Sequence, residues 1–131
     1  MYYIYNRYIR HRYFKEFMSE PLTPAVFHIL LALSDQERHG YAIIKEVSDQ
    51  TNGAIKLGAG TLYGTIKRLL ESGWIEESDT RPDPSIDDER RRYYRITPKG
   101  HLAATSEAER LEQLVRTSRA KKLLPKLGRA T

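Results

Sequence analysis

The sequence contains no cysteine and no long apolar run. Without cysteine the chain can form neither a disulfide nor a cysteine-ligated metal site, and such a composition suits a reducing compartment. No apolar run approaches the ~20 residues that a membrane-spanning helix needs. The first residues carry arginines among tyrosines and no apolar segment, so we expect no secretory signal, no membrane partner and a cytoplasmic location.

Residue patterns typical of catalysis and of metal binding are also missing. No nucleophile stands beside a base in a recognisable motif, and the histidines lack the spacing of metal ligands. We therefore expect no enzyme activity, no metal and no cofactor. The histidines concerned are His11, His28, His39 and His101.

The informative features of the sequence are its charge and its helical periodicity. Its 131 residues amount to one domain, and a hydrophobic fraction of 40% with a charged fraction of 30% suits a well-solvated helical fold. The net charge of +5 and a pI near 9.5 permit an anionic partner, either nucleic acid or a membrane surface.

Residues 1–20 form an extension with its own composition. Residues 1–17 contain five of the nine tyrosines and four basic residues, without a helical or strand period. Three interpretations remain open: a disordered basic arm, an additional helix packed by its aromatic side chains, or a stretch upstream of a true translation start at Met18.

Cap signals and apolar periodicity predict four helices from Leu22 onward. Thr23-Pro24 and Thr97-Pro98 each combine an N-cap residue with proline at the first helical position. Ser34–His39 is predicted to be a polar connector, and residues 54–57 are a candidate short strand. The predicted helices are Pro24 to about Leu33, a second helix that follows Gly40 and stops at Thr51–Gly53, a third from about Gly60 to Glu71, and a long helix from Thr97 to about Lys122.

Two predicted strands, Trp74–Ser78 and Arg91–Ile96, form a β-hairpin, and the second is rich in aromatic and β-branched residues. A two-stranded hairpin is marginal on its own, so it must pack on the helices. Three short helices and a hairpin form a winged helix-turn-helix, and we predict a mainly α fold with this architecture. The predicted divisions are a winged-helix domain at 21–97, a dimerisation helix at 98–122 and a frayed tail at 123–131.

The stretch LGAGTLYGTIKRLLESGWI, residues 57–75, places glycines at a helix start, as in phosphate-binding loops. A dinucleotide-binding enzyme is one interpretation, and Asp79 lies at a distance suited to a ribose-binding acid. However, the glycines are spaced G-x-G-x-x-x-G rather than G-x-G-x-x-G, and the fold would need several further βα units. The phosphate is therefore better assigned to a nucleic-acid backbone.

The side of the third predicted helix opposite Leu62 and Ile66 is small near its N-terminus and basic further along. Small residues allow close approach to a DNA groove, and hydroxyl or basic side chains can contact phosphates and base edges. In helix-turn-helix proteins the N-terminal part of this helix reaches the bases. The predicted DNA-contacting residues are Gly60, Thr61, Tyr63, Gly64, Thr65, Lys67 and Arg68.

The second predicted strand, Arg91–Ile96, is rich in arginine. Because side chains alternate along a strand, Tyr94 and Ile96 are predicted to face the core, with the stem of Arg92, and the other residues to face DNA. Acidic residues between Asp83 and Glu89 would repel phosphates, so we expect the strand arginines rather than the loop tip to contact DNA. The predicted wing contacts are Arg90, Arg91, Tyr93 and Arg95.

Three stretches together resemble the PadR-like family of transcriptional regulators. They are HGYAIIKEV at His39–Val47, GAGTLYGTIKRLLESGWI at Gly58–Ile75, and RRYYRITPKG at Arg91–Gly100, in the family's order and spacing. The resemblance covers Leu22 to about Gly100. It implies a bacterial-type homodimeric repressor that binds specific double-stranded DNA and belongs to the short branch, with a single C-terminal helix. It also implies that Tyr41 and Tyr63 contact phosphates.

By the same resemblance, the final helix mediates dimerisation. A two-fold dimer would place two recognition helices ~34 Å apart and require a roughly palindromic operator. Some short members bind flat aromatic compounds between tryptophans, but Trp74, the one tryptophan here, is expected to pack in the core, so any effector is unidentified. The alternative is a winged helix that docks a protein without binding DNA. The predicted dimerisation residues are Leu102, Ala104, Ala108, Leu111, Leu114 and Val115.

Overall fold

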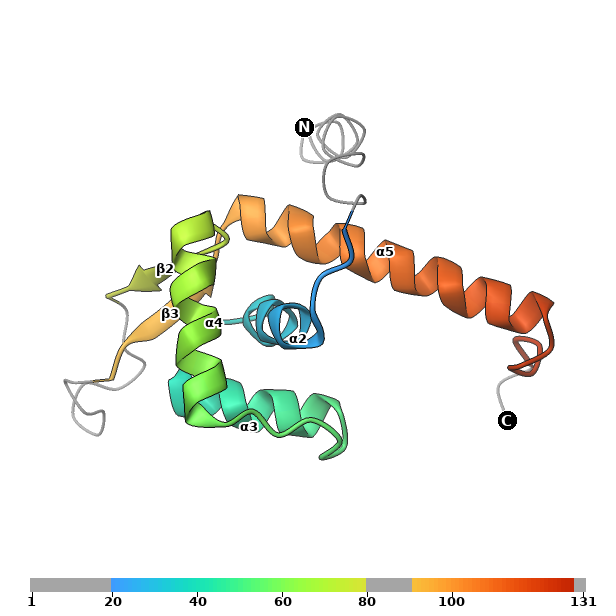
Figure 1. The fold of residues 1–131 in the computed structure, drawn as a ribbon, viewed down its shortest axis with the longest axis horizontal. Coiled ribbons are helices and arrows are strands. Elements are labelled where there is room, and N and C mark those ends of the chain that lie inside the picture. The colour runs from blue at the N-terminus through green and yellow to red at the C-terminus, as the bar shows by residue number, and fades with distance from the viewer. Residues whose placement is uncertain (1–19, 80–90, 129–131) are drawn as a thin grey trace. The chain divides into compact units, whose positions relative to one another are not determined.

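The computed structural model describes residues 20–79 and 91–128 (Figure 1). This part of the chain is mainly helical with a small antiparallel sheet, which confirms the predicted winged-helix class. The predictions for residues 1–17 and for the wing loop lie outside the described residues. The elements are α2 (Pro24–Leu33), β1 (Arg38–His39), α3 (Gly40–Gln50), α4 (Ala59–Ser72), β2 (Ile75–Ser78), β3 (Tyr93–Ile96) and α5 (Pro98–Ala120).

The helix boundaries follow from side chains that satisfy terminal backbone groups. The Thr23 hydroxyl accepts a hydrogen bond from the Val26 N–H at 3.3 Å, with proline next in the chain, as the sequence predicts. The Thr97 hydroxyl accepts from the Gly100 N–H at 3.1 Å at the start of α5. Helix α4 ends at Gly73, whose φ of 74° is the left-handed conformation that favours glycine.

The sheet has three strands in the order β1-β3-β2, whereas the sequence predicts two. The additional strand, Arg38–His39, comes from the predicted polar connector, and His39 pairs with Tyr93. A strand of two residues is too short to show alternation in a sequence, which explains why it was missed. The candidate strand at residues 54–57 is wrong, because this segment is a bend and coil.

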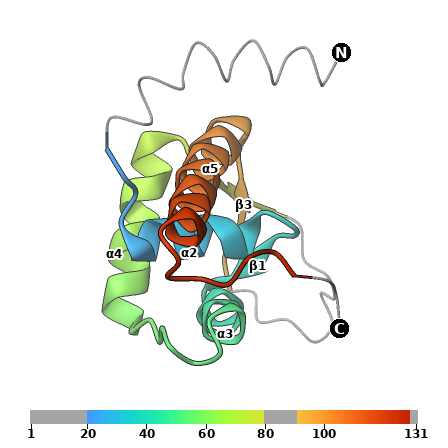
Figure 2. The ribbon, with the colours of Figure 1, turned by 90° about the vertical axis from the view of Figure 1, so that its right-hand side faces the viewer.

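The core lies between α2, α3, α4 and the sheet. Figure 1 shows α2 almost end-on beside α4 and α3, and Figure 2 shows it from the side. Each buried aliphatic side chain contributes about 1.5–3 kcal/mol relative to an exposed one. The largest fully buried side chains are Ile29, Leu30, Leu33, Ile43, Val47, Leu62, Thr65 and Ile75.

Leu22–Ala104 forms one compact unit, and α5 leaves this unit at Thr105 to continue in a second one. The predicted boundary between residues 97 and 98 therefore stays a prediction. Within residues 20–79 and 91–128, no helix combines the length and apolarity needed to cross a membrane.

Candidate nucleic-acid interface

Helix α4 has one buried and one exposed side. Leu62 and Ile66 are buried, as the sequence predicts, and so is Leu69, whereas Leu70 is exposed. The opposite side is open to solvent and combines small, hydroxyl and basic groups. Its exposed residues are Gly60, Thr61, Tyr63, Gly64, Lys67 and Arg68.

Thr65 does not belong to the exposed side, although the sequence predicted it there. Its exposed fraction is 0%, and its hydroxyl donates to the Thr61 carbonyl at 2.7 Å. The Arg68 guanidinium in turn donates to the Thr65 hydroxyl at 3.4 Å. A threonine can satisfy its hydroxyl within a helix and turn its methyl group to the core. Thr65 therefore supports the helix, and its predicted position on the exposed side is wrong.

Helix α3 begins beside the exposed side of α4. The His39 imidazole accepts a hydrogen bond from the Ala42 N–H at 3.2 Å and so caps the helix. The next residue, Gly40, lies against the Tyr63 ring: a Cβ added to Gly40 would be 2.5 Å from the Tyr63 hydroxyl oxygen. Tyr41 follows on the outer surface with 76% of its area exposed. This arrangement brings Tyr41 and Tyr63 to one surface.

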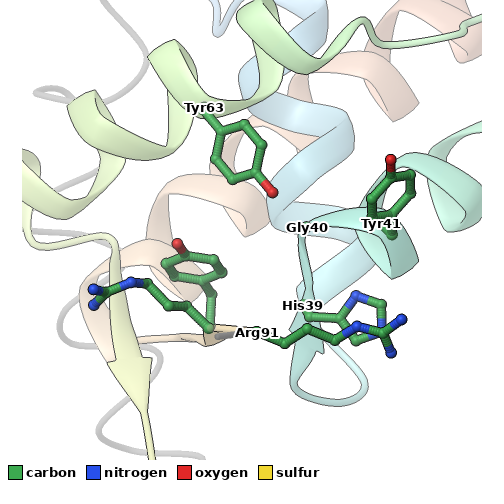
Figure 3. Close-up of a pocket in the computed structure, with 7 residues that line it drawn as sticks. His39, Gly40, Tyr41, Tyr63 and Arg91 are labelled. Atoms are coloured by element: carbon green, nitrogen blue, oxygen red, sulfur yellow. The ribbon is translucent and has the colours of Figure 1, made fainter. Parts of the chain in front are cut away.

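A cavity of about 450 Å³ opens where α3, α4 and β3 meet. Figure 3 shows Tyr63 reaching toward Gly40 from α4, while Arg91 extends toward the start of α3. The sequence analysis predicted Tyr41, Tyr63 and Arg91 as DNA contacts. It did not predict the other residues that line the cavity, because no periodic pattern in the sequence marks them as facing outward. The lining residues are His39, Gly40, Tyr41, Tyr63, Arg91, Arg92 and Tyr94.

In β3, Tyr94 is buried as predicted, but Tyr93 is buried too, with an exposed fraction of 7%. Tyr93 packs edge-on against the ring of His39, with the ring centroids 5.3 Å apart. Strand β1, which the sequence did not predict, lies beside β3 and supplies a neighbouring residue for both Tyr93 and Tyr94. The predicted position of Tyr93 on the outer face of the strand is therefore wrong, while its contact with DNA stays a prediction. Arg90 lies outside the described residues.

The arginines of the wing are paired with acids from neighbouring elements. Arg95 donates to Glu76 at 2.7 Å and lies 3.7 Å from Glu37. The hydrogen bond to Glu76, together with the charges of both acids, raises the pKa of Arg95 above its ordinary value. Arg92 forms an ion pair with Glu77 at 3.0 Å. The sequence analysis did not predict these glutamate partners. The register between β2 and β3 decides which side chains pair, and that register cannot be predicted from the length of the loop between the strands.

The predicted dimerisation residues divide between the two units. Leu102 and Ala104 are half-buried in the winged-helix unit, and Ala103 between them is fully buried. In the second unit Ala108 is exposed and Leu111 half-buried, while Leu114 and Val115 expose 51% and 39% of their area. Apolar side chains thus remain accessible along the C-terminal part of α5.

Groups that could serve a metal or a reaction are not gathered in the described part of the chain. Residues 20–79 and 91–128 contain no set of three acidic or histidine side chains close enough to hold a metal ion. The cavity presents tyrosines and arginines, which suit an anion better than a cation. The arrangement is that of a binding surface.

Comparison with known proteins identifies relatives with this architecture. A transcriptional regulator from Clostridium thermocellum is 28% identical, covers 76% of this chain and 90% of its own, and has a TM-score of 0.61. A PadR family transcription regulator from Clostridium difficile shares the fold at 20% identity, with a TM-score of 0.62 over 75% of this chain and 97% of its own.

Among curated proteins, uncharacterized protein X of Lysinibacillus sphaericus is 38% identical over 72 residues. That match covers 55% of this chain and 63% of the relative. The family model for the transcriptional regulator PadR-like family matches residues 29–106, which include α3, α4 and the sheet. The chain therefore belongs to the PadR-like family, whose members are transcriptional regulators and not enzymes.

Proposed function

We propose that this protein is a sequence-specific regulator that binds double-stranded DNA through the outer side of α4. One observation carries the proposal: α4 is held by a buried apolar side while its other side exposes Gly60, Thr61, Gly64 and Lys67. Two of these have no side chain, so the backbone can approach a groove floor. The hydroxyl and ammonium groups suit base edges and phosphates.

The surroundings of α4 support DNA rather than a small nucleotide as partner. Tyr41 and Tyr63 lie on the same surface and can donate to phosphate oxygens, which position a protein without reading sequence. The net charge of +5 favours association with a polyanion. Binding should therefore weaken steeply as salt rises, because each neutralised phosphate releases counterions.

The proposal includes a homodimer formed through the C-terminal part of α5. Leu114 and Val115 expose apolar area there, and apolar patches of this kind commonly mark an interface. Two subunits related by a two-fold axis would bind a roughly palindromic operator. Leu114→Asp should convert the dimer to monomer in analytical ultracentrifugation. Gln113→Asp, an exposed neighbour on the opposite side of the helix, should leave the dimer intact.

Repression, with release by an effector of unidentified chemistry, completes the proposal and rests on the family resemblance. A reporter driven by the protein's own promoter tests the direction of control. Deleting the gene should raise expression of the reporter, and a fall would identify an activator instead.

DNA binding itself is tested by fluorescence anisotropy on duplexes from the region upstream of its gene, at low and moderate salt. Sequencing the DNA that the purified protein retains would supply the operator. Tyr63→Ala and Lys67→Ala should both weaken binding, and Lys99→Ala, exposed at the start of α5, serves as the control. If neither variant of α4 changed the affinity, the site assignment would be wrong. Absence of any binding at low salt would favour a winged helix that docks a protein.

A further inference from the structure

The hydroxyl group of Tyr94 has no hydrogen-bond partner within residues 20–79 and 91–128, although Tyr94 is only 5% exposed. A hydroxyl that lines an open cavity and has no partner in the protein is available to a ligand that enters the cavity. Tyr94 lines the cavity between α3, α4 and β3, and Tyr63 is near enough to influence its pKa. Tyr94 and Tyr63 therefore line the same cavity.

The other groups around this cavity favour an anion. Arg91 and Arg92 line one side, and Glu77 offsets part of the charge of Arg92 through a 3.0 Å ion pair. Helix α3 starts at Gly40, which places about half a positive charge from the helix dipole at the cavity. Hydroxyl donors, guanidinium groups and a helix N-terminus are the combination that binds phosphate oxygens.

We propose that this cavity is a subsite for one backbone phosphate of the bound DNA, with the Tyr94 hydroxyl as a donor to that phosphate. The inference rests on the proposed function, because it assigns a phosphate contact to the same surface. Burial raises the pKa of Tyr94, with smaller contributions from Glu77 and Tyr63 and an opposing one from Arg92. The phenol therefore keeps its proton at neutral pH and remains a donor.

Gly40 gives the subsite its shape. The Tyr63 hydroxyl oxygen occupies the position that a side chain at residue 40 would need, 2.5 Å from an added Cβ. A larger residue would displace the Tyr63 ring from the wall of the cavity. Gly40 is therefore a positioning residue: it lets α4 and the start of α3 come close enough to share one phosphate.

Tyr94→Phe tests the proposal because it removes only the hydroxyl. A hydrogen bond from a neutral donor to a charged acceptor is strong enough that its loss should weaken DNA binding about tenfold. The loss should be equal for operator and for unrelated duplex, since phosphate contacts carry no sequence information. The thermal midpoint should stay the same or rise, because a hydroxyl without a partner in the free protein does not stabilise the fold.

A methylphosphonate scan of the operator locates the phosphate. At one position in each half-site, the neutral substitution should weaken the wild-type protein more than Tyr94→Phe, as expected for two groups that interact directly. Arg91→Ala should lower the slope of log affinity against log salt by about 0.9, whereas Tyr94→Phe should leave it unchanged.

Three outcomes would overturn the inference in distinguishable ways. If the wild-type protein binds DNA and Tyr94→Phe binds equally well, the subsite is wrong while the proposed function stands. A lower thermal midpoint for Tyr94→Phe at unchanged affinity would likewise assign the hydroxyl to folding. If the wild-type protein binds neither operator nor unrelated duplex at low salt, the proposed function itself fails.

Discussion

The outer side of α4 and the strand β3 both carry basic residues, but their charges are placed differently. Lys67 on α4 is exposed and has no ion pair with any residue in the described ranges 20–79 and 91–128. Arg92 and Arg95 near β3 each pair with a glutamate of β2. A paired arginine contributes less to the field that an approaching polyanion meets. The helix therefore offers charge that is available, whereas the charges of Arg92 and Arg95 are already offset.

This difference assigns the two regions different parts in the proposed complex. A helix with small residues and an accessible lysine can approach a DNA groove closely. Arginine side chains that pair with acids keep a fixed orientation, but they attract phosphates less strongly. Specific contacts and electrostatic attraction should therefore depend mainly on α4. The wing should contribute positioning through the cavity that Arg91 and Tyr94 line.

The largest effect is expected from the buried side of α4. Ile66→Ala should lower the free energy of unfolding by about 2–5 kcal/mol, because it leaves a cavity beneath the helix. Urea denaturation measures this change. Lys67→Ala, the adjacent exposed residue, should alter the same quantity by no more than about 0.5 kcal/mol. Equal losses for both variants would contradict the division of α4 into two sides.

Gly64→Ala should separate stability from binding. Nothing lies within 4 Å of a Cβ added at this residue, so the folded protein has room for the methyl group. Alanine in a helix should raise the free energy of unfolding by about 0.5–1 kcal/mol relative to glycine. The methyl group would nevertheless keep α4 from the groove floor, and affinity should fall about tenfold or more. Anisotropy that shows unchanged affinity would place the groove elsewhere.

Lys67→Ala and Arg95→Ala sharpen the comparison between helix and wing. The slope of log affinity against log salt should fall by about 0.9 for Lys67→Ala, the value for one lost phosphate contact. Arg95→Ala should change the slope less, because Glu76 and Glu37 already offset its charge. Titrations at several salt concentrations provide both slopes. A larger change for Arg95→Ala would reverse the assignment.

The smallest effect is expected from Glu76→Gln, which should raise DNA affinity a few-fold by releasing Arg95. Such exposed ion pairs contribute at most about 1 kcal/mol to stability, so the thermal midpoint should change little. Glu112→Gln provides a matched control, because Glu112 pairs with Arg116 on α5 at 2.6 Å. Equal gains from both variants would show that only net charge matters.

The sequence predicted the parts of the fold that depend on local signals. Caps at Thr23 and Thr97 and the buried spacing of α4 were all recognisable, because each involves residues within one or two turns. Strand β1 was not, because it exists only through pairing with β3. The error at Tyr93 follows directly, since that pairing supplies its ring contact with His39.

The candidate site was predictable only in part for the same reason. Tyr41, Tyr63 and Lys67 were assigned correctly to the surface, whereas Thr65 was placed by spacing alone although its hydroxyl bonds within the helix. The glutamate partners of the wing arginines and the cavity around Tyr94 depend on contacts between distant segments. Such contacts leave no period in the sequence.

One measurement tests the central claim most directly: amide chemical-shift changes in ¹⁵N-labelled protein titrated with operator DNA. The account predicts the largest changes in the N-terminal half of α4, at Gly60, Thr61 and Gly64, with further changes at Gly40 and Tyr94. The buried Leu69 and the C-terminal end of α5 should change least. Changes confined to α5, with α4 unaffected at saturating DNA, would contradict it.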